Sequence, residues 1–233
     1  MSRFGPGICG RGRATSLVAR RYDNGVPLSP EEFYRNALRD ADVDRRMSLS
    51  RMTGWEIFPF EPEGLRVVPL AAPVLPEPAR YGEGSLLCRN CSAGDSGVIW
   101  SNDRWRLTVF DQPSGAPLVV MLTPHDHYDL VDLPDDLASE LGMLIVHVAR
   151  AIESLSHVAR AHVSRWGDGG AHLHVFFFAR PEGFIQLRGT CLAIWDDLLA
   201  AVPRNVRDGD AREVAVTLAK SFGGRFEAPT RDE

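Results

Sequence analysis

The chain has 233 residues, of which 44% are hydrophobic and 24% are charged, with 26 Lys and Arg against 31 Asp and Glu. This composition is typical of a globular protein with one sizeable core, and no apolar run approaches the roughly 20 residues that a membrane-spanning helix needs. The formal net charge of -5 argues against a general nucleic-acid binder, which normally carries a basic excess.

The first 24 residues are rich in Gly, Arg and Ser and show no apolar period, which predicts a mobile tail. Its arginines are not followed by an apolar stretch, so we do not expect a secretory signal. A helix is expected to begin at Ser29, because this residue can cap it, Pro30 suits the first helical position and Glu32 completes a capping box. The stretch from Trp55 to Arg80 is dense in proline, which excludes a long helix and favours extended segments.

From Cys88 onward, short β-type runs and helical patterns follow one another. Five runs predict strands, at Val98–Trp100, Trp105–Phe110, Pro117–Leu122, Val158–Arg165 and Ala171–Ala179. Turn sequences separate the first three runs from one another and the fourth from the fifth. The clearest helix opens at Pro134, and its apolar stripe reaches Leu155 at helical spacing. Two more helices are expected near Thr190–Ala200 and Asp210–Phe222, the second closed by Gly223. The order β-β-β-α-β-β predicts an α+β fold with a mainly antiparallel sheet of five or more strands and a central helix.

The four cysteines, Cys9, Cys88, Cys91 and Cys191, are too sparse for a disulfide scaffold. In the absence of an export signal we expect a cytoplasmic chain with reduced thiols. Cys88 and Cys91 have the C-x-x-C spacing of a metal pair or a redox pair. A redox pair would open a helix in a βαβ unit, whereas the residues after Cys91 read as a loop. A tetrahedral metal site needs two further ligands besides these two thiolates.

Two histidines follow the glycine-rich turn Trp166–Gly170. In an extended strand, residues two apart project from the same face about 6.6 Å apart along the backbone. His172, His174 and Phe176 are therefore expected to share one side. Next to a turn that lets backbone approach a phosphate closely, this arrangement predicts a phosphate-handling site. The alternative is an edge strand with two solvated histidines.

The segment His172–Pro181, HLHVFFFARP, resembles the signature strand of the histidine-triad (HIT) superfamily. Upstream, Val98–Phe110 is similar to the family's first hairpin, Pro117–His127 to its strand that ends in a histidine, and Pro134–Leu155 to its central helix. The resemblance covers roughly Cys88 to Pro181, under half of the chain. It implies a HIT-like fold, usually paired as a homodimer, and a small-molecule ligand of the nucleotide or nucleotide-sugar type.

The resemblance also implies a nucleophile. Phe176 stands at the family's third histidine position, which is not histidine either in the related hexose-1-phosphate uridylyltransferases, where the middle histidine still forms the nucleotidyl intermediate. His174 occupies that middle position. Backbone N–H groups of the turn would hold the phosphate, although the family carries Gly-Gln where this chain has Gly167-Asp168. The residues expected to contact phosphate or nucleotide are Gly167, Asp168, Gly169, Gly170, Arg180 and Asn102.

In zinc-bearing relatives the two cysteines are joined by the histidine after the middle strand and by the first histidine of the signature. These positions are His127 and His172 here. The resemblance therefore implies a structural zinc ion held by Cys88, Cys91, His127 and His172.

Two hypotheses follow. The first is a nucleotidyl transferase or hydrolase that acts on a nucleotide phosphate ester or phosphoramidate through a nucleotidyl-histidine intermediate. The second is a HIT-like nucleotide-binding or scaffold protein without catalysis, because Phe176 and Asp168 replace polar groups that would assist the leaving group or hold phosphate. Neither nucleic acid nor a membrane is expected as a partner. The expected regions are a disordered tail at 1–24, an N-terminal extension packing on the core at 25–87, the HIT-like core at 88–182 and a C-terminal helical extension at 183–233.

Overall fold

The structure is a computed structural model that describes residues 28–112 and 114–228. The tail predicted for residues 1–24, with Cys9, lies outside the described residues. The chain divides into two units, one made of residues 1–47 and 68–73 and the other of residues 48–67 and 74–233. Among the described residues, none of the helices combines the length and the apolar character needed to span a membrane.

In the smaller unit, helix α1 (Pro30–Ala37) begins with the predicted capping box. The Glu32 N–H donates to Ser29 Oγ over 3.2 Å, and the Ser29 N–H donates to the Glu32 carboxylate over 2.8 Å. This confirms the predicted start of the helix. The Tyr34 hydroxyl donates to the Leu70 carbonyl over 3.2 Å, which joins α1 to residues 68–73 of the same unit.

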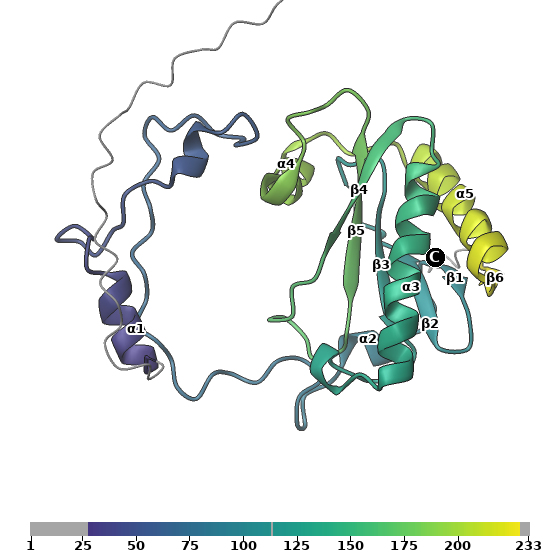
Figure 1. The fold of residues 1–233 in the computed structure, drawn as a ribbon, viewed down its shortest axis with the longest axis horizontal. Coiled ribbons are helices and arrows are strands. Elements are labelled where there is room, and N and C mark those ends of the chain that lie inside the picture. The colour runs from purple at the N-terminus through teal and green to yellow at the C-terminus, as the bar shows by residue number, and fades with distance from the viewer. Residues whose placement is uncertain (1–27, 113, 229–233) are drawn as a thin grey trace, which may run out of the picture. The chain divides into compact units, whose positions relative to one another are not determined.

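The larger unit is built on a six-stranded antiparallel sheet with the strand order β4-β5-β3-β2-β1-β6. This confirms the predicted α+β class. Figure 1 shows α3 and α5 side by side on one face of the sheet and α4 on the other. The strands are β1 (Val98–Ser101), β2 (Trp105–Val109), β3 (Val119–Pro124), β4 (Val158–Ser164), β5 (Val175–Pro181) and β6 (Arg225–Phe226). The helices are α2 (Arg89–Ser92), α3 (Asp135–Glu153), α4 (Leu192–Leu198) and α5 (Arg204–Phe222), with short 3₁₀ turns η1 (Arg51–Gly54), η2 (Leu130–Asp132) and η3 (Gly189–Cys191).

The main core lies between the sheet and the helices α3 and α5. Side chains alternate along a strand, so β2 sends Trp105, Leu107 and Val109 into this core. The predicted stripe of α3 meets them, and its buried residues are Leu137, Leu141, Leu144, Val148, Ala151 and Ile152. Helix α5 begins at Arg204 rather than at Asp210, because Pro203 already stands at its N-cap.

On the other face of the sheet, α4 covers a smaller apolar cluster formed by Ala116, Val119, Phe178, Leu187 and Leu192. The Trp195 indole of α4 donates to the Ile57 carbonyl over 2.9 Å. Residues around η1 therefore pack on the C-terminal part of the same unit.

Strand β5 begins at Val175, not at Ala171 as predicted. The Ala171 N–H donates to the Tyr81 carbonyl over 2.9 Å, and the Leu173 N–H donates to the Tyr128 carbonyl over 2.6 Å. Loops far away in the sequence thus take the hydrogen bonds that a neighbouring strand would take. His172 and His174 consequently lie in an irregular segment just before the strand rather than inside it.

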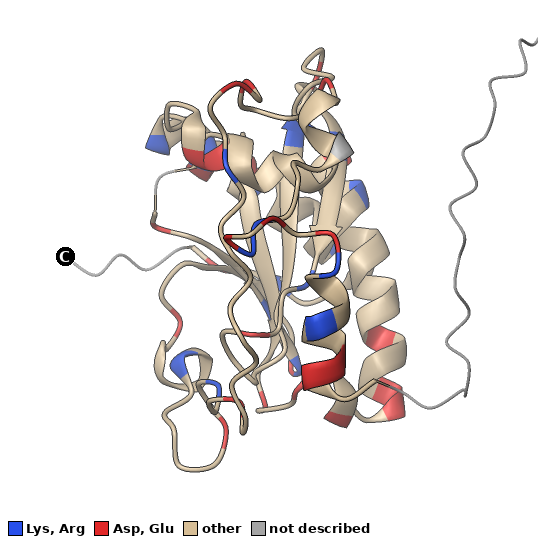
Figure 2. Cartoon of the chain, turned by 90° about the vertical axis from the view of Figure 1, so that its left-hand side faces the viewer, with Lys and Arg blue, Asp and Glu red and all other residues tan. Residues whose placement is uncertain are grey.

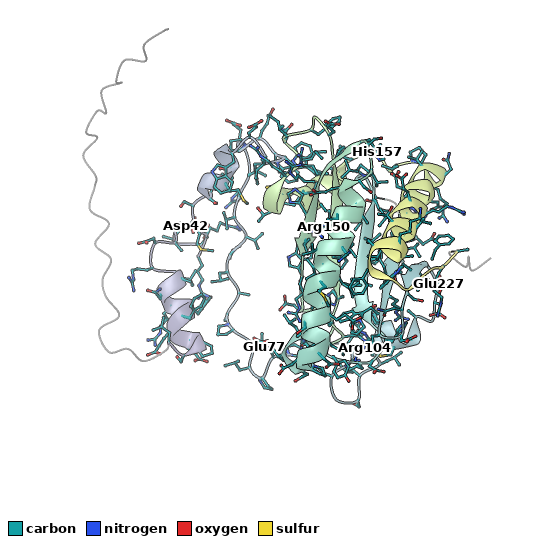
Figure 3. All side chains as sticks on the ribbon, turned by 45° about the vertical axis from the view of Figure 1, so that its right-hand side comes forward. Asp42, Glu77, Arg104, Arg150, His157 and Glu227 are labelled. Carbon is teal, nitrogen blue, oxygen red and sulfur yellow. The ribbon has the colours of Figure 1, made fainter. Side chains whose placement is uncertain are left out.

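Basic and acidic residues alternate along the chain in the view of Figure 2. Figure 3 shows Arg104 near the N-terminal end of α3 and His157 beyond the C-terminal end of that helix. Arg104 pairs with Asp136 over 2.8 Å and with Glu140 over 3.2 Å. His157 Nε2 lies 2.9 Å from Asp210 Oδ2, and burial raises the pKa of this carboxyl group. Polar side-chain contacts thus tie down both ends of the helical layer.

Candidate functional site

Four potential metal ligands meet beside the start of β5. Cys88 stands at the N-cap of α2 and Cys91 lies within this short helix. His127 follows β3, and His172 precedes β5. One ligand atom from each residue lies within 4.8 Å of the others, and this is the only such group among the described residues. Three segments far apart in the sequence therefore supply one compact set of two sulfur and two nitrogen donors.

The spacing of these atoms fits a tetrahedral zinc ion. Zinc–sulfur bonds of about 2.3 Å and zinc–nitrogen bonds of about 2.0–2.1 Å at a tetrahedral angle place sulfur and nitrogen about 3.6 Å apart. His172 Nδ1 lies 3.5 Å from Cys88 Sγ and 3.4 Å from Cys91 Sγ, and His127 Nδ1 lies 3.4 Å from Cys91 Sγ. The residues present thus suit the ion in both donor type and distance.

A backbone carbonyl orients the His172 ring. His172 is 2% exposed, and its Nε2 lies 3.0 Å from the Pro124 carbonyl oxygen. Nε2 therefore carries the hydrogen and donates it, which leaves the lone pair of Nδ1 facing the sulfurs. Burial lowers the pKa of His172, which favours the neutral ring that a metal needs.

The cysteine loop is held by its own backbone and by an arginine. The Cys91 N–H donates to Cys88 Sγ over 3.4 Å. Burial, and then the hydrogen bond with Cys88, raise the pKa of the Cys91 thiol, whereas a bound dication would hold it as a thiolate. Arg106 of β2 donates to the Asn90 carbonyl over 2.5 Å and to the Gly94 carbonyl over 2.9 Å. Sequence reasoning missed Arg106, although its place between inward-facing Trp105 and Leu107 assigns it to the other face of the sheet.

Gly82 packs against the ring of His127. Its φ is +90°, and a Cβ atom at this position would lie 2.7 Å from His127 Cε1. Real side chains essentially never come so close, so a substitution must displace the imidazole. Gly84, two residues on, has a φ of +56° but nothing within 4 Å of its Cβ position. The two glycines thus share a positive φ, which strains any substitution, but differ in their contact with His127.

We expect Gly82→Ala to weaken zinc binding by about 10- to 100-fold, the range found when the surroundings of a metal ligand are disturbed. Gly84→Ala is the matched control and is expected to bind zinc like the wild type. Competition against a chromophoric zinc chelator measures both affinities. Equal affinities of the two variants would contradict the placement of His127 at the site.

His174 lies beside this cluster, with both ring nitrogens against backbone carbonyls. Nδ1 is 2.7 Å from the His172 oxygen and Nε2 is 2.6 Å from the Trp166 oxygen. The ring stands edge-on to Phe176, with a centroid distance of 5.5 Å. A nucleophilic imidazole needs one anchored and one free nitrogen. The Nδ1 contact provides the anchor, whereas Nε2 is covered because the turn before β5 folds back over the ring.

The predicted phosphate turn runs from Trp166 to Gly170. Gly167 is buried, and its carbonyl accepts a hydrogen bond from Arg80 Nη1 over 2.8 Å. Asp168 and Gly169 are exposed, and Gly170 bridges to Tyr81. The structure therefore places the turn directly beside the His174 ring, through the Trp166 carbonyl.

Two other predicted contact residues lie elsewhere or are engaged. Arg180 is six residues beyond His174, about 20 Å along an extended chain, and donates to the Phe184 carbonyl over 3.3 Å. Asn102 occupies the turn between β1 and β2, where its Oδ1 accepts from the N–H of Trp105 over 2.7 Å and its Nδ2 donates to Glu140 over 3.2 Å. The structure does not bring Arg180 to His174, and the side chain of Asn102 serves the turn.

A cavity of about 480 Å³ opens on the second face of the sheet, between α2, the end of β2 and the start of α5. Phe176 links it to His174: its ring stacks on Phe110 at 5.8 Å, and it pairs in register with Met121. Phe110 and Met121 line the cavity together with Arg89, Asp111, Arg204 and Arg207. Sequence reasoning missed this cavity, because it depends on α5 returning to the edge of the sheet.

No family model matches the sequence, and no curated protein matches it. Solved structures do resemble the chain in fold. A Hit-like protein involved in cell-cycle regulation from Bartonella henselae is 15% identical, and the match covers 56% of this chain and 93% of that chain with a TM-score of 0.42. A Zn-bound histidine triad family protein from Mycobacterium smegmatis is 17% identical, with 54% and 85% covered and a TM-score of 0.40. Both are histidine-triad proteins.

These neighbours belong to the HIT family, and the segment HLHVFFFARP of this chain resembles the signature strand of that family. A structure described as a uridylyltransferase is 18% identical, and the match covers 58% of this chain but only 45% of that chain, with a TM-score of 0.40. At such identities the likeness to HIT proteins concerns the fold.

Proposed function

We propose that this chain is a nucleotidyl transferase or hydrolase that acts on a nucleotide phosphate ester or phosphoramidate through His174. The observation that carries the proposal is the contact of 2.7 Å between His174 Nδ1 and the His172 carbonyl. This contact holds the ring in one orientation and makes Nε2 the reacting nitrogen. The segment that carries His174 also carries the buried ligand His172, so one short stretch joins the metal cluster and the nucleophile.

The cavity on the second face of the sheet supports a nucleoside ligand. Its volume of about 480 Å³ lies within the range of about 300–1,000 Å³ that is common for small-molecule sites. Phe110 and Met121 offer apolar surface to a base, and Asp111 offers a carboxylate to sugar hydroxyls. Phe176 lies between Phe110 of this cavity and His174, so a nucleotide whose base occupied the cavity could direct its phosphate along Phe176 towards His174.

In the proposed reaction the lone pair of Nε2 attacks the α-phosphorus and forms a nitrogen–phosphorus bond. The bond from phosphorus to the leaving group breaks, and the leaving group departs with the electron pair. Water or a second substrate then attacks the same phosphorus, releases the nucleotide and restores His174. Because Phe176 has no proton to give, leaving groups that are stable as anions, such as a phosphate, suit this site better than amines.

We further propose that Cys88, Cys91, His127 and His172 hold zinc in a structural role. Four protein ligands close a tetrahedral site, so the ion supplies a cross-link between the three segments rather than an open position for a substrate. The homodimer that the family resemblance implies and the cytoplasmic location stay predictions.

A second candidate function is nucleotide binding without catalysis. The contact of 2.6 Å between His174 Nε2 and the Trp166 carbonyl favours it, because the reacting nitrogen is covered in this conformation. The replacement of the third histidine by Phe176 favours it too.

Trapping the intermediate distinguishes the two functions. The zinc-loaded full chain is incubated with nucleoside diphosphate sugars and with nucleoside phosphoramidates labelled at the α-phosphorus, and is quenched in alkali, in which a phosphohistidine bond survives. We expect the label on the peptide that contains His174. Calorimetric binding of these nucleotides without label on any peptide would favour the second function, and the absence of binding would contradict both.

A further inference from the structure

Residues Arg80–Glu83, which we call the strap, contact both the metal cluster and the turn beside His174. They lie outside the segment that resembles HIT proteins. Gly82 lies against the ring of His127, and the Tyr81 carbonyl accepts from the Ala171 N–H over 2.9 Å, with Tyr81 bridging to Gly170 in parallel. A short segment from the N-terminal side of the chain therefore touches a metal ligand and the turn beside His174.

Arg80 is the polar centre of the strap. Its guanidinium donates to the Gly167 carbonyl over 2.8 Å, to Asp129 over 2.8 Å and to Glu83 over 2.7 Å. Asp129 also accepts from Arg165 over 2.5 Å, and its side chain is 10% exposed. Asp129 thus accepts from two arginines: Arg165, which directly precedes Trp166, and Arg80, which holds the Gly167 carbonyl directly after it.

The hydrogen bond from Arg80 to the Gly167 carbonyl bears on which atom the His174 ring faces. Gly167 follows Trp166 directly, so anchoring the Gly167 carbonyl restrains the position of the preceding peptide group. The carbonyl of that group is Trp166 O, which lies 2.6 Å from His174 Nε2. Because a carbonyl oxygen only accepts, Nε2 meets it as an N–H donor, and Nε2 can offer a lone pair to a phosphorus only after the turn has shifted.

We propose that the strap is a latch on the nucleophile: Arg80, acting through Gly167, keeps the Trp166 carbonyl over His174 Nε2. Arg80 is then a positioning residue, since it touches the turn and not the reacting atoms. The latch rests on the proposed role of His174, but its geometry can be tested without a substrate. It also gives the N-terminal extension a task at the site.

Chemical modification tests the latch. The zinc-loaded full chain is treated with limiting diethyl pyrocarbonate, which acylates accessible imidazole nitrogens, and the extent at each histidine is read by peptide mass spectrometry. The measured quantity is the rate at His174 divided by the rate at His125, an exposed histidine outside the metal cluster. We expect Arg80→Ala to raise this ratio about tenfold, the effect of losing a hydrogen bond from a charged donor. Arg80→Lys, which keeps one donor, is expected to give an intermediate ratio.

Arg160→Ala is the matched control, because Arg160 is exposed on β4 and its guanidinium donates to the adjacent Ala159 carbonyl. It is expected to leave the ratio unchanged. A general loosening of the fold would also raise the rate at His172, which is 2% exposed. An unchanged ratio in Arg80→Ala, or a wild-type His174 that reacts as fast as His125, would overturn the latch. A raised ratio in a protein that forms no nucleotidyl adduct would uphold the latch and contradict the proposed function.

Discussion

Replacing His174 by glutamine is expected to abolish the nucleotidyl adduct and to lower turnover by about 10³-fold or more, as the loss of a nucleophile does in other covalent enzymes. Glutamine keeps the polarity and approximate size of the side chain, but its amide nitrogen has no lone pair with which to attack phosphorus. His174 is not one of the four clustered ligands, so zinc content and thermal stability are expected to stay close to the wild type. Rapid-quench measurement of the label on protein and in product gives both rates.

His125→Gln is the matched control for this prediction, because His125 is exposed and its Nε2 contacts only the Asn102 carbonyl, 3.0 Å away. It is expected to form the adduct at the wild-type rate. If His174→Gln formed the adduct as fast as this control, another group would be the nucleophile. A His174→Gln protein that has lost its zinc would instead show that the ring supports the metal cluster.

Replacing Cys91 by serine is expected to have the largest effect on stability. Structural zinc sites contribute about 10–16 kcal/mol in small domains, so one ligand of four accounts for roughly 2.5–4 kcal/mol. For a chain of this length about 2–4 °C of melting temperature corresponds to each kcal/mol, so we expect a fall of about 5–16 °C. Differential scanning calorimetry of zinc-loaded protein measures the change.

A chelator provides the complementary experiment. It is expected to lower the melting temperature of the wild type towards that of Cys91→Ser, and to leave the variant almost unchanged. The two perturbations act on the same ion, so their effects are not additive. A wild type whose melting temperature responds neither to zinc nor to the chelator would contradict a metal at these four residues.

Local patterns in the sequence predicted the elements that local chemistry determines. The capping box at Ser29 marks the start of α1, and the apolar stripe from Leu137 onward defines α3. The start of β5 could not be predicted in this way. The N–H groups of Ala171 and Leu173 bond to Tyr81 and Tyr128, and no local pattern reports such distant partners.

The residues of the candidate site likewise fall into those that the sequence predicted and those that it did not. The four metal ligands were placed by the family resemblance, and the structure brings them together. The residues that hold the site, Arg80, Arg106 and Asp129, carried no such signal. Because 25 of the 26 basic residues are arginine, an arginine that fixes a loop looks like any arginine on the surface. The role of Arg80 and Arg106 in holding these loops is evident only from the backbone carbonyls to which they donate, and other segments of the chain supply those carbonyls.

The short strand β6 changes how the sheet can grow. It pairs with β1 at Trp100 and Ser101, and the Glu227 N–H donates to the Ile99 carbonyl over 2.8 Å. β6 is the outermost strand on this side and has only two residues, so this border of the sheet is a very short edge, whereas β4 (Val158–Ser164) forms a seven-residue edge on the other side. Two copies that joined along β4 would each keep the short edge outward. Association through this sheet is therefore expected to end at a pair rather than to continue into a fibre.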